Sequence, residues 1–155
     1  MNALDDLCAY FERLSAHNLG ELGVYYALDA WFKDPFHEVT GVDAIRNILR
    51  HTFDKLPGAR FRVIRRFPGA DQHAVILWEM DFTMPVIGQP TTICGATHLT
   101  FDADGKVTMH RDYWDVAEEL YARLPVLKWL MRALARQAAA PSQNRGGSPR
   151  RRAGR

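Results

Sequence analysis

The sequence AVILWEMDFTM, residues 74–84, alternates in chemical character from one position to the next. Successive side chains of a strand point to opposite faces of its sheet. One face would carry Leu77, Glu79, Asp81 and Thr83, and the other an unbroken apolar row made of Ile76, Trp78, Met80, Phe82 and Met84. The alternation predicts a strand of a sheet.

Two orientations of this strand remain open. In the simpler one the apolar row is buried and Glu79 and Asp81 face solvent, as is common in antiparallel sheets with one covered face. In the other, the two acids face an internal cavity and the apolar row packs on another subunit or on a closing helix. One-sided burial favours the simpler orientation.

Strand-like runs also occupy residues 59–68, 91–102 and 106–114, with turn sequences between them such as DADGK, residues 102–106. Apolar spacing predicts helices on both sides of this meander and a short strand that Pro35 ends. The helices cover residues 3–16, 20–28, 42–56 and 116–137, and the short strand covers residues 30–34. This order predicts an α+β fold with helices gathered on one face of a curved antiparallel sheet.

The length of 155 residues predicts one domain. Cys8 and Cys94 match no metal or redox spacing, so a reduced, cytoplasmic protein is expected. The acidic, amphipathic N-terminus is not a secretory signal. No uninterrupted apolar stretch is long enough to span a membrane.

Residues 140–155, APSQNRGGSPRRRAGR, hold five arginines and no acid. Removing those five charges from the net +2 leaves residues 1–139 at −3. We therefore expect one α+β domain over residues 1–139 and a disordered basic tail over residues 140–155. A solubilising tail is favoured over a contact with nucleic acid or lipid, and no specific nucleic-acid partner is expected.

The candidate chemistry centres on two stretches. In FKDPFHEV, residues 32–39, Pro35 holds Asp34 in an extended conformation, as a turn-former or as a carboxylate positioned to move protons. His37 lies two residues beyond Pro35. In KVTMHRDYWD, residues 106–115, alternation places His110, Asp112 and Trp114 on one face.

Two longer stretches carry a family resemblance. YFERLSAHNLGELGVYYALDAWFKDPFHEVTGVDAIR, residues 10–46, resembles the opening of ketosteroid isomerases of the nuclear transport factor 2-like (SnoaL-like) superfamily. WEMDFTM, residues 78–84, and GKVTMHRDYWDVAEELYARLP, residues 105–125, are similar to limonene-1,2-epoxide hydrolase of the same superfamily. The resemblance implies a curved sheet wrapped into a cone, with helices on its concave face, and a homodimer formed through the sheets.

Similarity to the isomerases implies that Asp34 is a general base and Tyr10 an oxyanion donor. Thr97 stands where the isomerases carry a second donor, a protonated aspartic acid. The same similarity directs His110, Asp112 and Trp114 into the pocket.

Similarity to the epoxide hydrolase instead matches Asp81 and Asp112 to its two catalytic aspartates. Glu79 replaces the arginine that bridges them. Phe32 and Asp34 replace its water-holding tyrosine and asparagine. Neither known mechanism transfers intact.

These residues predict a cofactor-free enzyme that performs isomerisation or epoxide and water chemistry on a small hydrophobic metabolite. One group would stay a carboxylate and take a proton while another donates one. Asp34 or Asp112 would be the base, Asp81 or His110 the acid, and Tyr10 a donor. The expected substrate-binding residues are Trp114, Phe32, Thr97, Glu79 and Trp31.

Three other interpretations stay open. The polar cluster could be a set of structural hydrogen bonds, with Asp34, Glu79, Asp81, His110 and Asp112 as its members. The fold could also serve as a non-catalytic ligand-binding or dimerisation module. A metal site is disfavoured because no His-x-His or Glu-x-x-His spacing is present.

Overall fold

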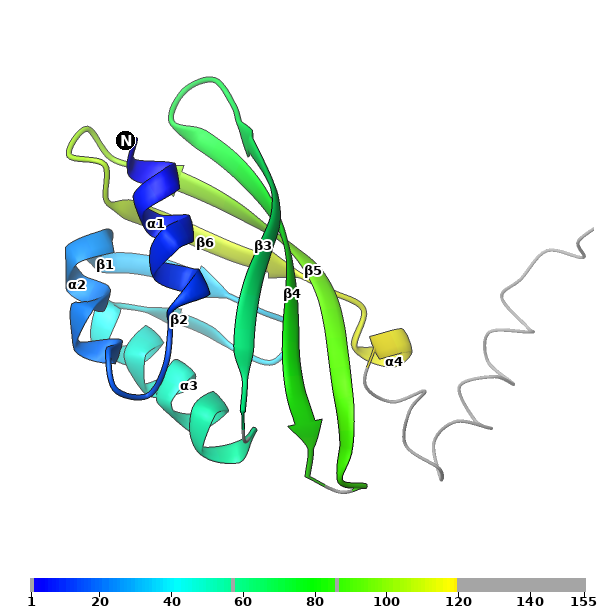
Figure 1. The fold of residues 1–155 in the computed structure, drawn as a ribbon. Coiled ribbons are helices and arrows are strands. Elements are labelled where there is room, and N and C mark those ends of the chain that lie inside the picture. The colour runs from blue at the N-terminus through cyan, green and yellow to red at the C-terminus, as the bar shows by residue number, and fades with distance from the viewer. Residues whose placement is uncertain (1, 57, 86, 120–155) are drawn as a thin grey trace, which may run out of the picture.

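The computed structural model describes residues 2–56, 58–85 and 87–119, which form an α+β fold around one curved six-stranded sheet (Figure 1). The helices are α1 (Ala3–Glu12), the 3-10 helix η1 (Leu19–Glu21), α2 (Leu22–Tyr25), α3 (Val42–Lys55) and α4 (Val116–Glu119). The strands are β1 (Tyr26–Lys33), β2 (Glu38–Thr40), β3 (Arg60–Pro68), β4 (His73–Met84), β5 (Gln89–Phe101) and β6 (Val107–Tyr113).

The strand order across the sheet is β2-β1-β6-β5-β4-β3. The meander β3 to β6 is antiparallel, as its turn sequences predict. The pair β1 and β6 is parallel, a feature that the sequence pattern did not reveal. This pairing sets Phe32 opposite His110 and Lys33 opposite Arg111. The Asp-Pro stretch after β1 thus lies beside the carboxyl end of β6.

The apolar row of β4 faces the interior. Ile76, Trp78, Met80, Phe82 and Met84 are all buried, whereas the positions between them are exposed or half-buried. The simpler orientation of residues 74–84 is therefore confirmed. The prediction that the sheet buries one face is confirmed with it, because Thr91, Ile93, Thr97 and Leu99 of β5 are buried by the same alternation.

Helix α1 packs on the sheet beside β3, and α3 packs beside β1. The side chain of Asn2 caps α1 by accepting a hydrogen bond from the Asp5 N–H at 2.9 Å. The buried face of α1 includes Leu7, Cys8 and Phe11. Both helices thus cover the interior face of the sheet and leave space between them for a pocket.

Several predicted boundaries change. Helix α1 ends at Glu12 rather than at residue 16, and the helix expected over residues 20–28 ends at Tyr25, because the chain enters β1 at Tyr26. Strand β2 was not predicted. It has three residues and pairs antiparallel with β1 after the turn around Pro35.

The helix expected over residues 116–137 begins as α4, and the remainder lies outside the described residues. The domain boundary after residue 139 and the basic tail also lie outside them and stay predictions. Within the described ranges, no helix has the length and apolar character to cross a membrane.

Candidate functional site

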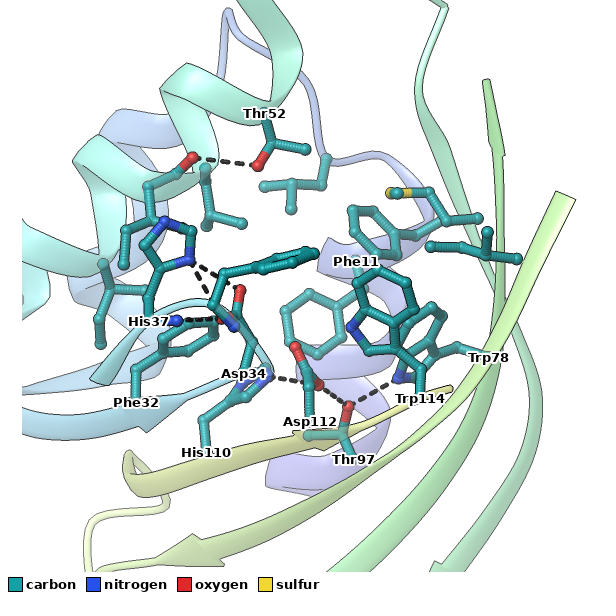
Figure 2. A pocket seen from close by; sticks show the side chains of 18 of the residues that line it. Phe11, Phe32, Asp34, His37, Thr52, Trp78, Thr97, His110, Asp112 and Trp114 are labelled. Carbon is teal, nitrogen blue, oxygen red and sulfur yellow. Dashed lines mark hydrogen bonds and ion pairs between the residues drawn. The ribbon is translucent and has the colours of Figure 1, made fainter. Parts of the chain in front are cut away.

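A pocket of about 440 Å³ lies between the helices and the interior face of the sheet (Figure 2). This volume falls in the usual range for small-molecule sites. Its walls are mainly apolar and come from several elements, among them Phe11 of α1, Ile45 and Leu49 of α3, and Ile76, Met80 and Phe82 of β4. The pocket therefore suits a small molecule with a largely apolar body.

A continuous chain of hydrogen bonds runs along one wall of the pocket. The Tyr26 hydroxyl lies 2.6 Å from Nδ1 of His110, and Nε2 of His110 lies 2.9 Å from Oδ1 of Asp112. The Thr97 hydroxyl donates to the same Oδ1, and Nε1–H of Trp78 donates to Oγ1 of Thr97 at 2.7 Å. All five residues line the pocket, and Figure 2 shows the bonds that join the last four.

Most of this chain is shielded from solvent. Tyr26, Thr97 and His110 are buried, while the side chain of Asp112 keeps 18 % of its surface exposed. Burial, with a smaller contribution from the nearby Asp112 charge, raises the pKa of Tyr26 well above its ordinary value, so this phenol stays protonated. The ring of Phe32 packs on the His110 imidazole with ring centroids 4.9 Å apart.

Both hydrogen bonds to Asp112 converge on Oδ1. Within the described part of the chain, Oδ2 receives no hydrogen bond. Figure 2 shows this second oxygen directed away from the bonded chain, toward the pocket interior. Asp112 therefore combines a fixed orientation with one carboxylate oxygen that a ligand can reach.

A second acid and histidine pair lies at another part of the same pocket. Oδ1 of Asp34 accepts hydrogen bonds from the backbone N–H groups of Phe36 and His37 at 2.8 Å and 2.6 Å. Nδ1 of His37 lies 3.0 Å from Oδ1 and 3.1 Å from Oδ2 of Asp34. Asp34 is thus the turn-former that its place before Pro35 suggests, and its carboxylate also lines the pocket.

An aromatic pair adjoins Asp34. The rings of Phe36 and Trp114 meet edge to face with centroids 5.6 Å apart. Trp114, Asp34 and Asp112 line both this pocket and a more open hollow that Lys33 and Arg111 also line. These three residues therefore mark the place where the apolar pocket meets solvent.

The structure brings six of the expected site residues to one pocket. The expected catalytic residues Asp34, His110 and Asp112 line it, and so do the expected binding residues Phe32, Thr97 and Trp114.

The structure does not bring Glu79 and Asp81 to this pocket. Both lie on the opposite face of β4, where Arg62 pairs with Glu79 and with Asp81, the latter at 3.1 Å. The Thr92 hydroxyl also donates to Asp81. The strand alternation that buries Trp78 and Met80 forces these acids outward, so Asp81 and Asp112 form no dyad.

Tyr10 and Trp31 also lie away from the pocket lining. The Tyr10 hydroxyl donates to the backbone carbonyl of Asn18 at 3.2 Å, and its ring stacks on Tyr25. Burial raises the pKa of Tyr10 to about 12. Trp31 lies on the face of β1 opposite Phe32. The oxyanion-donor position expected for Tyr10 is therefore not reached by its hydroxyl.

Tyr26 and Trp78 are polar members of the site that the sequence did not single out: Tyr26 fell within the helix expected over residues 20–28, and Trp78 belonged to the apolar row of residues 74–84. Both sit in apolar surroundings, and the partners that give them a polar function are 84 and 19 positions away in the chain. Alternation sets Phe32, Trp78 and Thr97 on interior faces, but it gave no signal for Tyr26, because residues 20–28 were expected to be helical and Leu28, two positions further on, is exposed.

Among the described residues, no three His, Cys, Asp or Glu side chains are grouped so that they could hold a metal ion.

The fold resembles that of several solved structures. The chain superimposes on an NTF2-like protein of unknown function from Exiguobacterium sp. 255-15 with a TM-score of 0.63 and 19% identity, covering 74% of this chain and 98% of that one. It also matches an LEH-like epoxide hydrolase from M. tuberculosis, with a TM-score of 0.61, 18% identity and coverage of 88% and 94%. A SnoaL-like polyketide cyclase from Agrobacterium tumefaciens gives a TM-score of 0.62, 20% identity and coverage of 90% and 99%.

At these identities the structural matches establish the nuclear transport factor 2-like fold. A search of curated protein sequences gives no match. The sequence profile of the SnoaL-like domain matches residues 7–110, about two thirds of the chain and most of the pocket-forming elements. On this evidence the chain belongs to the SnoaL-like domain family.

Proposed function

We propose that this protein binds a small, largely apolar molecule in the pocket and exchanges a proton with it at Asp112, without a cofactor. The observation that carries the proposal is the way in which the Asp112 carboxylate is held and oriented. Oδ1 is held by Thr97 and His110, and Oδ2 faces an apolar space of about 440 Å³. A carboxylate oriented in this way is suited to general base catalysis.

Asp112 is preferred to Asp34 as the base because the two carboxylates differ in their surroundings. Two backbone N–H donors from one tight turn occupy Asp34 Oδ1, and His37 Nδ1 lies close to both carboxylate oxygens. If Asp34 took up a proton from a ligand, its hydrogen bonds to the backbone N–H groups of the turn after β1 would weaken. Asp34 and His37 supply a second titratable pair at the same pocket, able to return a proton to the ligand or to solvent.

Proton transfer within the substrate, as in an isomerisation, is favoured over epoxide opening. Epoxide opening by the hydrolase scheme needs two catalytic aspartates, and Asp81 lies on the outer face of β4 with Arg62. Solved proteins of this fold include an LEH-like epoxide hydrolase and a SnoaL-like polyketide cyclase, so the fold itself does not decide between the two reactions.

A second candidate function is ligand binding without turnover. It is favoured by the position of Tyr10, whose hydroxyl bonds to Asn18 rather than facing the pocket. Tyr10 then does not supply the phenolic donor that stabilises a developing oxyanion in the isomerases. Such a binding module would use the same apolar walls but would not need Oδ2 of Asp112.

We also propose a homodimer, formed through a different set of side chains from the apolar row of β4. The apolar row of β4 faces inward, so a sheet-mediated dimer would instead use the exposed side chains Phe67, Val75 and Leu77 on β3 and β4. Sedimentation equilibrium tests this proposal, and a monomer at all accessible concentrations would reject it.

Ligand binding is tested by thermal shift with a panel of apolar ketones, enones, epoxides and steroid-like lipids. A ligand at 100 times its Kd should stabilise the protein by about 2.7 kcal/mol. Leu49→Trp places a large ring in the pocket and should abolish the shift, whereas Val24→Trp, at an exposed site on α2, should preserve it. Shifts that survive Leu49→Trp would place the binding site elsewhere.

Catalysis is tested by Asp112→Asn, which keeps the size of the side chain but removes its basicity. Turnover of any substrate found in the panel should be lost, while binding persists. Asp81→Asn makes the same chemical change on the outer face of the sheet and should leave turnover intact. Activity that depends on Asp81 and not on Asp112 would refute the assignment.

A further inference from the structure

The hydrogen-bond chain at Asp112 has a direction that its chemistry determines. The indole Nε1–H of Trp78 can only donate, so Oγ1 of Thr97 is the acceptor of their 2.7 Å bond. The Thr97 hydroxyl proton is then available for Oδ1 of Asp112, its other partner. Oδ1 of Asp112 is therefore the acceptor of the bond from Thr97.

The same reasoning extends to His110. Its Nε2 lies 2.9 Å from Oδ1 of Asp112, the oxygen that already accepts the hydroxyl proton of Thr97. Nε2 must therefore carry the proton of this bond. In a neutral imidazole the other nitrogen, Nδ1, is then an acceptor, and the Tyr26 hydroxyl at 2.6 Å is its donor.

We propose that Tyr26 is a positioning residue, which fixes His110 as the Nε2–H tautomer and so holds the hydrogen bond to Oδ1 of Asp112 while Oδ2 stays free for a ligand. The relevance of Oδ2 to a reaction rests on the proposed function. The tautomer and its dependence on Tyr26 do not, because they follow from the contacts in the ligand-free protein.

The two other forms of His110 fit these surroundings poorly. In the Nδ1–H tautomer, Nε2 would direct a lone pair at Oδ1 of Asp112, bringing two acceptors together. In the imidazolium, Nδ1–H would donate to Tyr26, and the Tyr26 hydroxyl proton would have no acceptor among the described residues. Either form leaves a buried polar group without a proper partner, which is costly.

The groups around His110 give no competing charge. From β1 it is faced by Tyr26 and Phe32, from α1 by Phe11, from β5 by Leu99 and on its own strand by Asp112. Of these, only Tyr26 and Asp112 are titratable. Burial raises the pKa of Tyr26 well above its ordinary value, which agrees with its place as the donor to Nδ1.

The proposal is tested by long-range ¹H–¹⁵N NMR of the full chain with ¹⁵N-labelled histidine. His110 is assigned by the signals that disappear in His110→Gln. The wild-type ring should show a protonated Nε2 and an unprotonated Nδ1. Tyr26→Phe should lower the population of this tautomer by several fold, because Nδ1 loses its donor.

Tyr25→Phe is the matched control. Its hydroxyl accepts from Arg13 and its ring stacks on Tyr10, so it should leave the His110 spectrum unchanged. A wild-type His110 with a protonated Nδ1 would overturn the proposal, and so would a Tyr26→Phe spectrum equal to that of the wild type. The wild-type measurement decides the tautomer even where Tyr26→Phe fails to fold. If His110 is the Nε2–H tautomer but the protein turns over no substrate, the proposed function is rejected and the proposal for Tyr26 stands.

Discussion

Gly95→Ala is the substitution that couples the packing of the sheet most directly to the pocket. Gly95 lies opposite Trp78 in the β4–β5 register, and the indole lies across the space where a side chain would be. A Cβ atom at residue 95 would stand 2.3 Å, 2.6 Å and 2.8 Å from Cζ2, Cη2 and Cε2 of Trp78. These separations are far shorter than any van der Waals contact, so the ring or the strand must move.

The indole has little room to move. Trp78 is 6% exposed, the ring of Phe61 meets it edge to face, and its Nε1 is bonded to Thr97. Overpacking of this kind costs about 1–3 kcal/mol. Loss of the Trp78–Thr97 hydrogen bond would add about 1 kcal/mol. We therefore expect Gly95→Ala to lower the free energy of unfolding by about 2–4 kcal/mol.

Urea denaturation measures this loss. With a slope of about 2 kcal/mol per molar urea, the midpoint should fall by about 1–2 M. Gly23→Ala is the control, because a Cβ there meets nothing within 4 Å and the residue is helical. It should be neutral or stabilise the protein by up to about 1 kcal/mol. Trp78→Phe removes the two atoms that would lie closest to the new Cβ, Cζ2 and Cη2, so the cost of Gly95→Ala should shrink in that background. A Gly95→Ala protein as stable as the wild type would refute this packing.

Three further predictions concern stability. Leu99→Ala opens a cavity at a fully buried position and should cost about 2–5 kcal/mol in urea denaturation; a cost below 1 kcal/mol would contradict its burial. Burial raises the pKa of Cys8 from 9.0 to about 11, so the unfolded chain releases this proton first. Stability should therefore fall as pH rises from 9.0 toward 11, and less steeply in Cys8→Ala; equal slopes would refute the assignment. Arg62→Ala breaks two partly exposed ion pairs and should cost under about 1 kcal/mol.

The order of elements could be predicted because strand alternation and helical spacing are local signals. The alternation at residues 74–84 locates β4 within one residue, and DADGK locates the β5–β6 turn, where Gly105 has a φ of 77°. Strand β2 was missed because three residues are too few to show a period. The parallel pairing of β1 with β6 was missed because it joins segments about 80 residues apart.

The candidate site was predictable in part for the same reason. Alternation brought His110, Asp112 and Trp114 to one face, and the chain turn at Pro35 set Asp34 near them. Resemblance to the epoxide hydrolase suggested Asp81, yet in this chain the buried Trp78 and Met80 settle which face of β4 is inward. The function of Tyr26 depends on a contact with His110 across the sheet, which no local pattern encodes.

Proton exchange in D₂O is the most direct test of chemistry at Asp112. The probe is an apolar bicyclic ketone such as 2-decalone, and NMR follows the replacement of its α-protons by deuterium. The wild-type protein should accelerate exchange above the buffer rate, Asp81→Asn should match the wild type, and Asp112→Asn should fall to the buffer rate. Exchange that Asp112→Asn leaves unchanged, or no acceleration by the wild type, would contradict a catalytic carboxylate in this pocket.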